Sequence, residues 1–166
     1  IIRKNRNSLA ILTGDETKED LLKLSNDIFQ YYGLGCRSVS KLFVPNDYNF
    51  DAFFEAMYHW NPIINGAKYA NNYDYNKAVY LMSEFKMLEN GFLMIKEDES
   101  YASPIATLFY EHYDSLETLS EKLNQDSSKI QCIVSNQLSD EHLPFGSTQT
   151  PKLEDYADGV DTIDFL

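Results

Sequence analysis

Short apolar runs of strand length alternate along this chain with longer segments whose apolar residues recur at helical spacing. Strands that alternate with helices in this way form βαβ units, in which the strands are parallel and the helices cover the sheet. The sequence therefore predicts an α/β fold with three layers, a mostly parallel sheet flanked by helices. We expect strands at residues 8–12, 39–44, 92–95, 104–110 and 129–135, and helices at residues 16–32, 49–60, 71–85 and 115–125.

The length of the chain, 166 residues, suits one domain with its own hydrophobic core. We expect residues 1–166 to form a single domain, in which residues 136–166 are mostly loop and end in a strand at 162–166. The chain does not begin with methionine, and it opens on what reads as the approach to a strand. We therefore expect a fragment, the C-terminal part of a longer protein.

Charge and cysteine content exclude several classes of partner and compartment. The net charge of −12 argues against nucleic acid or an anionic membrane as the ligand, because both require a basic surface. No apolar run approaches the ~18 residues of a membrane-spanning helix. Two cysteines are too few for the disulfide framework of a secreted domain, so we expect a cytoplasmic protein with reduced thiols.

Cys36 is the candidate nucleophile, because it follows a predicted helix and precedes a predicted strand. Gly33 and Gly35 give the intervening turn conformational freedom and leave space for a substrate. Nearby Arg37 and Lys41 would favour the thiolate, which is the reactive form. The alternative from spacing alone is a small buried cysteine that fills a tight turn.

The remaining candidate groups suggest no second site. Cys132 lies within an apolar run typical of a core strand, so we interpret it as structural. None of the three histidines pairs with another at the spacing of metal ligands, and we expect no metal. The tyrosine- and asparagine-rich segment 69–77 is consistent with either a pocket lining or packing.

Four segments in order resemble the LuxC-type acyl-CoA reductases, which belong to the aldehyde dehydrogenase superfamily. They are KNRNSLAIL at residues 4–12, GLGCRSVSK at 33–41, KYANNYDYNK at 68–77 and DYADGVDT at 155–162. The resemblance implies an aldehyde-dehydrogenase-like catalytic domain that reduces a long-chain fatty acyl-CoA to an aldehyde through an acyl-cysteine at Cys36. It implies NADPH as cofactor, with NADH as the alternative, bound mainly by a domain absent from this chain. No glycine-rich phosphate loop lies between a predicted strand and helix here.

The same resemblance assigns further residues and partners. Gly35 and Arg37 would flank the nucleophile, Phe145 and Gly146 would lie in a loop at the active-site entrance, and Glu99 would hold the nicotinamide ribose. It also implies a homo-oligomer, with acyl-transferase and synthetase partners. Hydrolytic aldehyde dehydrogenases carry a glutamate base before the first of these strands, whereas residues 1–5 contain no acid. This difference favours acyl-CoA reduction over oxidation of an aldehyde to an acid.

Two other functions remain open from the sequence. One is a CoA-acylating dehydrogenase for short aldehydes, which chain-length preference would distinguish. The other is a non-catalytic interaction module that keeps the fold, in which Cys36 would be buried and unreactive. In either catalytic case we expect this fragment to be inactive by itself.

Overall fold

The computed structural model describes residues 5–136, 138–153, 155, 161 and 164. Six strands form one sheet in the order β3-β4-β5-β2-β1-β6. All neighbouring strands are parallel except β3, which runs antiparallel to β4 at one edge. The predicted α/β class with a mostly parallel sheet is confirmed. The strands are β1 (Asn7–Ile11), β2 (Val39–Pro45), β3 (Met87–Glu89), β4 (Met94–Glu97), β5 (Thr107–Tyr113) and β6 (Ile130–Val134).

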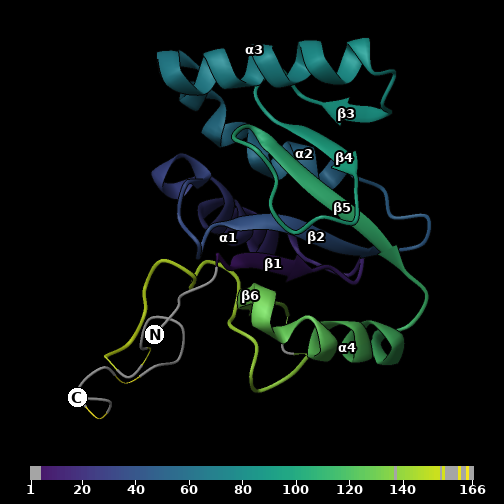
Figure 1. The fold of residues 1–166 in the computed structure, drawn as a ribbon, viewed down its shortest axis with the longest axis vertical. Coiled ribbons are helices and arrows are strands. Elements are labelled where there is room, and N and C mark those ends of the chain that lie inside the picture. The colour runs from purple at the N-terminus through teal and green to yellow at the C-terminus, as the bar shows by residue number, and fades with distance from the viewer. Residues whose placement is uncertain (1–4, 137, 154, 156–160, 162–163, 165–166) are drawn as a thin grey trace.

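Helices cover both faces of this sheet and make the three predicted layers (Figure 1). Helices α1 and α2 pack on one face, α4 packs on the other, and α3 lies at the β3–β4 end. The α-helices are α1 (Lys18–Phe29), α2 (Asp51–Met57), α3 (Ala67–Met82) and α4 (Leu116–Gln125), and the 3₁₀ helices are η1 (Gln30–Gly33), η2 (Tyr58–Asn65) and η3 (Ser127–Lys129).

The central strands are apolar on both faces because both faces are covered. Ala10 and Leu12 pack in the cluster that includes α1 and α2, whereas Leu9 and Ile11 pack with α4. Successive side chains of a strand point to opposite faces, so a strand between two helical layers reads as a continuous apolar run. This explains why β1 and β2 were predictable from their short apolar runs.

Helix α1 begins with a capping box and ends earlier than predicted. The Thr17 hydroxyl accepts from the Asp20 backbone N–H at 3.2 Å, and the Asp20 carboxylate accepts from the Thr17 N–H at 3.0 Å. At the other end Tyr31, Tyr32 and Gly33 have φ angles of 56°, 60° and 69°. A left-handed backbone cannot continue a right-handed helix, so the prediction of a helix to residue 32 was wrong. The C-cap is Gln30.

Other boundaries differ from prediction for local reasons. Helix α3 begins four residues before the predicted start, so segment 69–77 lies entirely within it. Strand β5 begins at Thr107 because residues 104–107 form a turn, closed by the Thr107 N–H to the Pro104 carbonyl at 3.1 Å. Strand β3 was not predicted, since three residues carry too little periodicity to reveal it.

The predicted strand at 162–166 lies outside the described residues, apart from Asp164. Of the described residues after β6, Leu143 forms a parallel bridge with Val134 beside the last strand. In the described part of the chain, no helix has both the length and the apolar character that crossing a membrane requires.

We expect the free energy of unfolding to decrease in acid, because Asp98 becomes protonated. Burial alone would raise the pKa of this carboxyl, but Lys96 and the Ser100 N–H stabilise the charged form and hold the pKa at about 2. Because the folded pKa is lower than the unfolded one, the contribution is present above the unfolded pKa and disappears as the pH falls through about 2. The loss should be about 2 kcal/mol.

Urea unfolding of the wild-type chain and of Asp98→Asn, measured between pH 5 and pH 2, tests this expectation. The wild-type free energy of unfolding should fall more steeply than that of the variant over this range. Parallel pH profiles would show that the Lys96–Asp98 ion pair contributes nothing measurable.

Candidate functional site

Cys36 lies in an exposed turn between η1 and β2, on the side of the sheet where the N-terminal ends of the parallel strands lie. The Ser38 N–H donates to the Gly35 carbonyl at 2.9 Å, and the Gly35 N–H donates to the Ser38 hydroxyl at 3.3 Å. The Ser8 hydroxyl of β1 donates to the Cys36 carbonyl at 2.8 Å. These bonds fix the backbone around the cysteine while its side chain remains open to solvent.

The loop that follows residue 143 returns to this turn from the other end of the sequence. The Arg37 Nε donates to the Thr148 carbonyl, across 111 residues of sequence. Beside it, the Gln149 side-chain amide donates to the Ser38 hydroxyl at 3.3 Å. The structure therefore brings together two of the predicted regions, the Cys36 turn and the loop that contains Gly146.

A buried carboxylate that was not predicted from the sequence anchors this loop. Asp27 of α1 is 1% exposed, and it accepts from the Gly146 N–H at 2.6 Å. It also accepts from the Thr148 N–H at 3.0 Å and from the Thr148 hydroxyl at 2.8 Å. Burial raises the pKa of the Asp27 carboxyl, and these donors oppose part of that shift. The available signal was an acid within the apolar stripe of a predicted helix, between Leu24 and Ile28.

Gly146 and Phe145 fix the same loop on α1. Gly146 has a φ of 86°, and a Cβ at this position would lie 3.2 Å from the Lys23 Cβ, so a glycine is required here. The Phe145 side chain is buried in the core cluster that includes α1 and α2. The buried Phe145 side chain therefore anchors the loop to the hydrophobic core, while the backbone of the loop reaches the Cys36 turn.

Two residues assigned from the sequence do not join this cluster. Glu99 is exposed after β4, and among the described residues no hydrogen bond or ion pair links it to the Cys36 turn. Lys41 was expected to support the Cys36 thiolate, but it is fully buried and its ammonium contacts the Asp98 carbonyl and the Glu111 carboxylate, the latter at 3.1 Å. That expectation was wrong, because the strand pleat directs Lys41 to the α4 side of the sheet.

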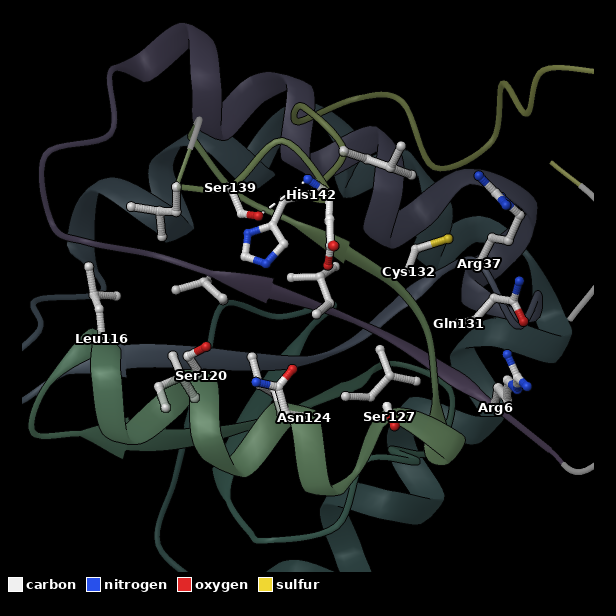
Figure 2. A pocket seen from close by; sticks show the side chains of 18 of the residues that line it. Arg6, Arg37, Leu116, Ser120, Asn124, Ser127, Gln131, Cys132, Ser139 and His142 are labelled. Carbon is white, nitrogen blue, oxygen red and sulfur yellow. Dashed lines mark hydrogen bonds between the residues drawn. The ribbon is translucent and has the colours of Figure 1, made fainter. Parts of the chain in front are cut away.

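Cys132 is 7% exposed on β6, in agreement with a structural thiol. Burial raises its pKa, against the opposing influence of Arg37 and Ser8. It lines a groove of about 600 Å³ along the outer edge of β6, between α4 and residues 138–143. Figure 2 shows Cys132 and Arg37 near one end of this groove and Leu116 near the other.

The segment 69–77 makes mostly packing contacts. Tyr69 and Tyr73 are buried beside Met94, and the Asn76 side chain donates to the Ile105 carbonyl at 3.0 Å. Tyr69 also lines a cavity of about 20 Å³ together with Gly33 and Pro104. A space of this size holds little more than one water molecule, so it does not accommodate an acyl chain.

The β1–α1 turn does not offer free backbone donors to a dinucleotide phosphate. At the β1–α1 turn, where a phosphate would meet a helix start, the Glu16 carboxylate accepts from the Thr13 N–H at 2.6 Å and from the Gly14 N–H at 3.0 Å. This acid occupies the donors that a phosphate would need, so the turn does not fit a nicotinamide dinucleotide. No group of three or more His, Cys, Asp or Glu side chains gathers to hold a metal ion within the described part of the chain.

Comparison with known proteins shows which solved structures share this fold. No protein-family model matches the sequence, and no curated protein matches it. Solved structures of aldehyde dehydrogenases do match. An indole-3-acetaldehyde dehydrogenase complexed with NAD⁺ is 12% identical with a TM-score of 0.55, and the match covers 81% of this chain and 34% of that one.

Two further structures agree with this likeness. An NAD-dependent aldehyde dehydrogenase from Sinorhizobium meliloti is 12% identical with a TM-score of 0.52, covering 87% of this chain and 35% of that one. A gamma-glutamyl-gamma-aminobutyraldehyde dehydrogenase from Burkholderia cenocepacia is 14% identical with a TM-score of 0.51, covering 81% and 34%. The chain thus has the fold of part of these enzymes and spans about a third of their length.

Proposed function

We propose that this chain is the cysteine-bearing catalytic part of a reductase that converts a long-chain fatty acyl-CoA to an aldehyde. The observation that carries the proposal is the exposed Cys36 thiol. It lies in a hydrogen-bonded turn just before the central strand β2, and the next residue, Arg37, is bonded to the loop at Thr148. The aldehyde-dehydrogenase fold of the domain supports an oxidoreductase that acts at the aldehyde or acyl level. The LuxC-type resemblance of the sequence narrows this class to acyl-thioester reduction.

The first step assigned to this chain is acyl transfer. The Cys36 thiolate attacks the thioester carbonyl, a new carbon–sulfur bond forms, and CoA leaves as its thiolate. The carbonyl oxygen carries negative charge during this step. No described residue accepts a hydrogen bond from the backbone N–H of Cys36, so this donor is available to the oxyanion. Arg37 follows Cys36 directly in the chain, and its Nε is held by the Thr148 carbonyl.

The second step is reduction of the acyl-cysteine to an aldehyde, which restores the Cys36 thiolate. NADPH, held mainly by a part of the protein outside this chain, would supply the hydride for this step. The comparison with the resembling family supports survival of the acyl-cysteine until then, because residues 1–5, which correspond to the segment that carries the water-activating glutamate in hydrolytic aldehyde dehydrogenases, contain no acid. Such a base would divert the intermediate to a free acid.

Product analysis with the full-length protein tests the proposal. Long-chain acyl-CoA and NADPH should yield one CoA and one fatty aldehyde for each NADPH oxidised, and NADH should be less effective. Acyl-CoA series of different lengths would separate a long-chain reductase from a short-chain acylating dehydrogenase. A fatty acid as the product, or no release of CoA, would contradict the proposal.

The proposal extends to the assembly. We expect the full-length enzyme to be a cytoplasmic homo-oligomer that receives acyl groups from acyl-transferase or synthetase partners. Size-exclusion chromatography with light scattering measures the first point, and a purified enzyme that is monomeric at working concentration would contradict it.

A further inference from the structure

Asp27 is a charged group for which the acyl-transfer chemistry has no direct use. It is buried on α1, and its two oxygens accept the Gly146 N–H at 2.6 Å, the Thr148 N–H at 3.0 Å and the Thr148 hydroxyl at 2.8 Å. A buried carboxylate is a poor means of gaining stability, because it loses its hydration. It is an effective means of holding several donors of one loop in one arrangement.

The loop that Asp27 holds is also the loop that holds the residues directly after Cys36. The Thr148 carbonyl accepts from the Arg37 Nε, and Gln149 donates to the Ser38 hydroxyl at 3.3 Å. Thr148 therefore connects the two sets of contacts: its N–H and hydroxyl bind Asp27, and its carbonyl binds Arg37. A shift of Thr148 would therefore move the side chain of Arg37, the residue that directly follows Cys36.

We propose that Asp27 is a positioning residue for Cys36, which acts through Thr148 to hold Arg37 and the thiol turn in the arrangement that acyl transfer requires. This inference rests on the proposed function of Cys36. Attack on a thioester is sensitive to displacements of about 1 Å, so loosening the loop should slow acyl transfer even when the fold survives.

The test is the single-turnover rate of Cys36 acylation by a long-chain acyl-CoA in the full-length protein. Asp27→Asn keeps the size of the side chain but replaces one acceptor oxygen with a donor, so one loop contact must break. We expect the acylation rate to fall about 10- to 100-fold. Thr17→Ala is the matched control, because it removes the N-cap of the same helix and leaves the loop contacts intact. Its acylation rate should stay close to that of the wild type.

A second pair of variants guards against misfolding of Asp27→Asn. Thr148→Val removes the hydroxyl donor to Asp27 and should slow acylation, and Thr148→Ser should restore the rate because it returns the hydroxyl. Wild-type acylation rates in folded Asp27→Asn and in Thr148→Val would overturn the inference. Equal losses in Thr17→Ala and Asp27→Asn would also overturn it, because general destabilisation would then account for both.

The reaction of Cys36 with iodoacetamide separates this inference from the proposed function. If the wild-type protein is not acylated by acyl-CoA, the proposed function fails. Alkylation of Cys36 would still report on its surroundings, and a changed rate in Asp27→Asn, with Thr17→Ala unchanged, would support the positioning role. Identical alkylation rates in all three proteins would overturn that role.

Discussion

Cys36→Ser is expected to lower acyl-CoA reduction by the full-length protein at least about 10³-fold. A serine hydroxyl is a weak nucleophile unless a general base removes its proton, whereas a thiol supplies a reactive anion near neutral pH. Within the described residues no histidine is bonded to the Cys36 turn, so the introduced serine would find no histidine base there. Steady-state release of CoA and formation of aldehyde measure the loss.

Cys132→Ser is the matched control for this prediction. Cys132 is the other cysteine of the chain, it is buried on β6, and no step of the mechanism uses it. The control should retain most of the activity. A Cys36→Ser enzyme with near wild-type turnover would contradict the role of Cys36 as nucleophile, and an equal loss in both variants would indicate a structural effect instead.

Glu111→Gln is expected to destabilise the domain by about 3 kcal/mol. The Glu111 carboxylate lies between two ammonium groups: it contacts the Lys41 Nζ at 3.1 Å and also the Nζ of Lys122. Lys41 is fully buried, and burial lowers its pKa while Glu111 raises it. Neutralising Glu111 leaves the buried Lys41 ammonium with neutral partners, among them the Asp98 carbonyl and the Phe43 ring, and without its counter-ion. This is far more costly than losing an exposed ion pair.

The pH dependence of this deficit has a definite sign. A lysine whose folded pKa lies below its unfolded pKa binds fewer protons in the folded state, so stability rises as the pH rises between the two values. Without Glu111 the pKa of Lys41 should fall further. The deficit of Glu111→Gln relative to the wild type should therefore shrink at alkaline pH, where Lys41 loses its proton.

Urea unfolding followed by the fluorescence of Trp60, the only tryptophan of the chain, measures this effect. Glu97→Gln is the matched control, because Glu97 is exposed at the end of β4. This substitution should leave the free energy of unfolding almost unchanged. Lys41→Met combined with Glu111→Gln should recover most of the lost stability, since the buried charge is then absent. A double variant as unstable as Glu111→Gln alone would contradict this account.

The sequence was sufficient for the fold class because the strongest signals here are long apolar patterns. Strands β1 and β2 are buried on both faces, whereas β6 is the half-buried last strand of the sheet. Helix α4 follows its N-cap Ser115, whose hydroxyl accepts the Thr118 N–H at 3.2 Å. The sequence also placed Cys36 in a helix-to-strand turn, since the glycines and the flanking periodicities are local features. Boundaries were less predictable where the backbone leaves regular conformations, as at Tyr31 and Tyr32.

The surroundings of Cys36 were less predictable, because they depend on contacts between distant segments. Lys41 is five residues from Cys36 in sequence, yet the pleat of β2 directs it toward Glu111. Conversely, Thr148 and Asp27 are 121 residues apart and share two hydrogen bonds. Neither pairing can be read from local patterns, since a helix or strand period reports which face a residue occupies but not which loop folds onto that face.

Covalent capture of the intermediate tests the central claim most directly. The full-length protein is incubated with a long-chain acyl-CoA in the absence of reduced cofactor, and its intact mass and peptide map are then recorded. We predict an added acyl group on Cys36 that is absent from Cys36→Ser and disappears when NADPH is supplied. An unmodified Cys36 that is also inert toward alkylating reagents would contradict the covalent mechanism and would favour a non-catalytic module.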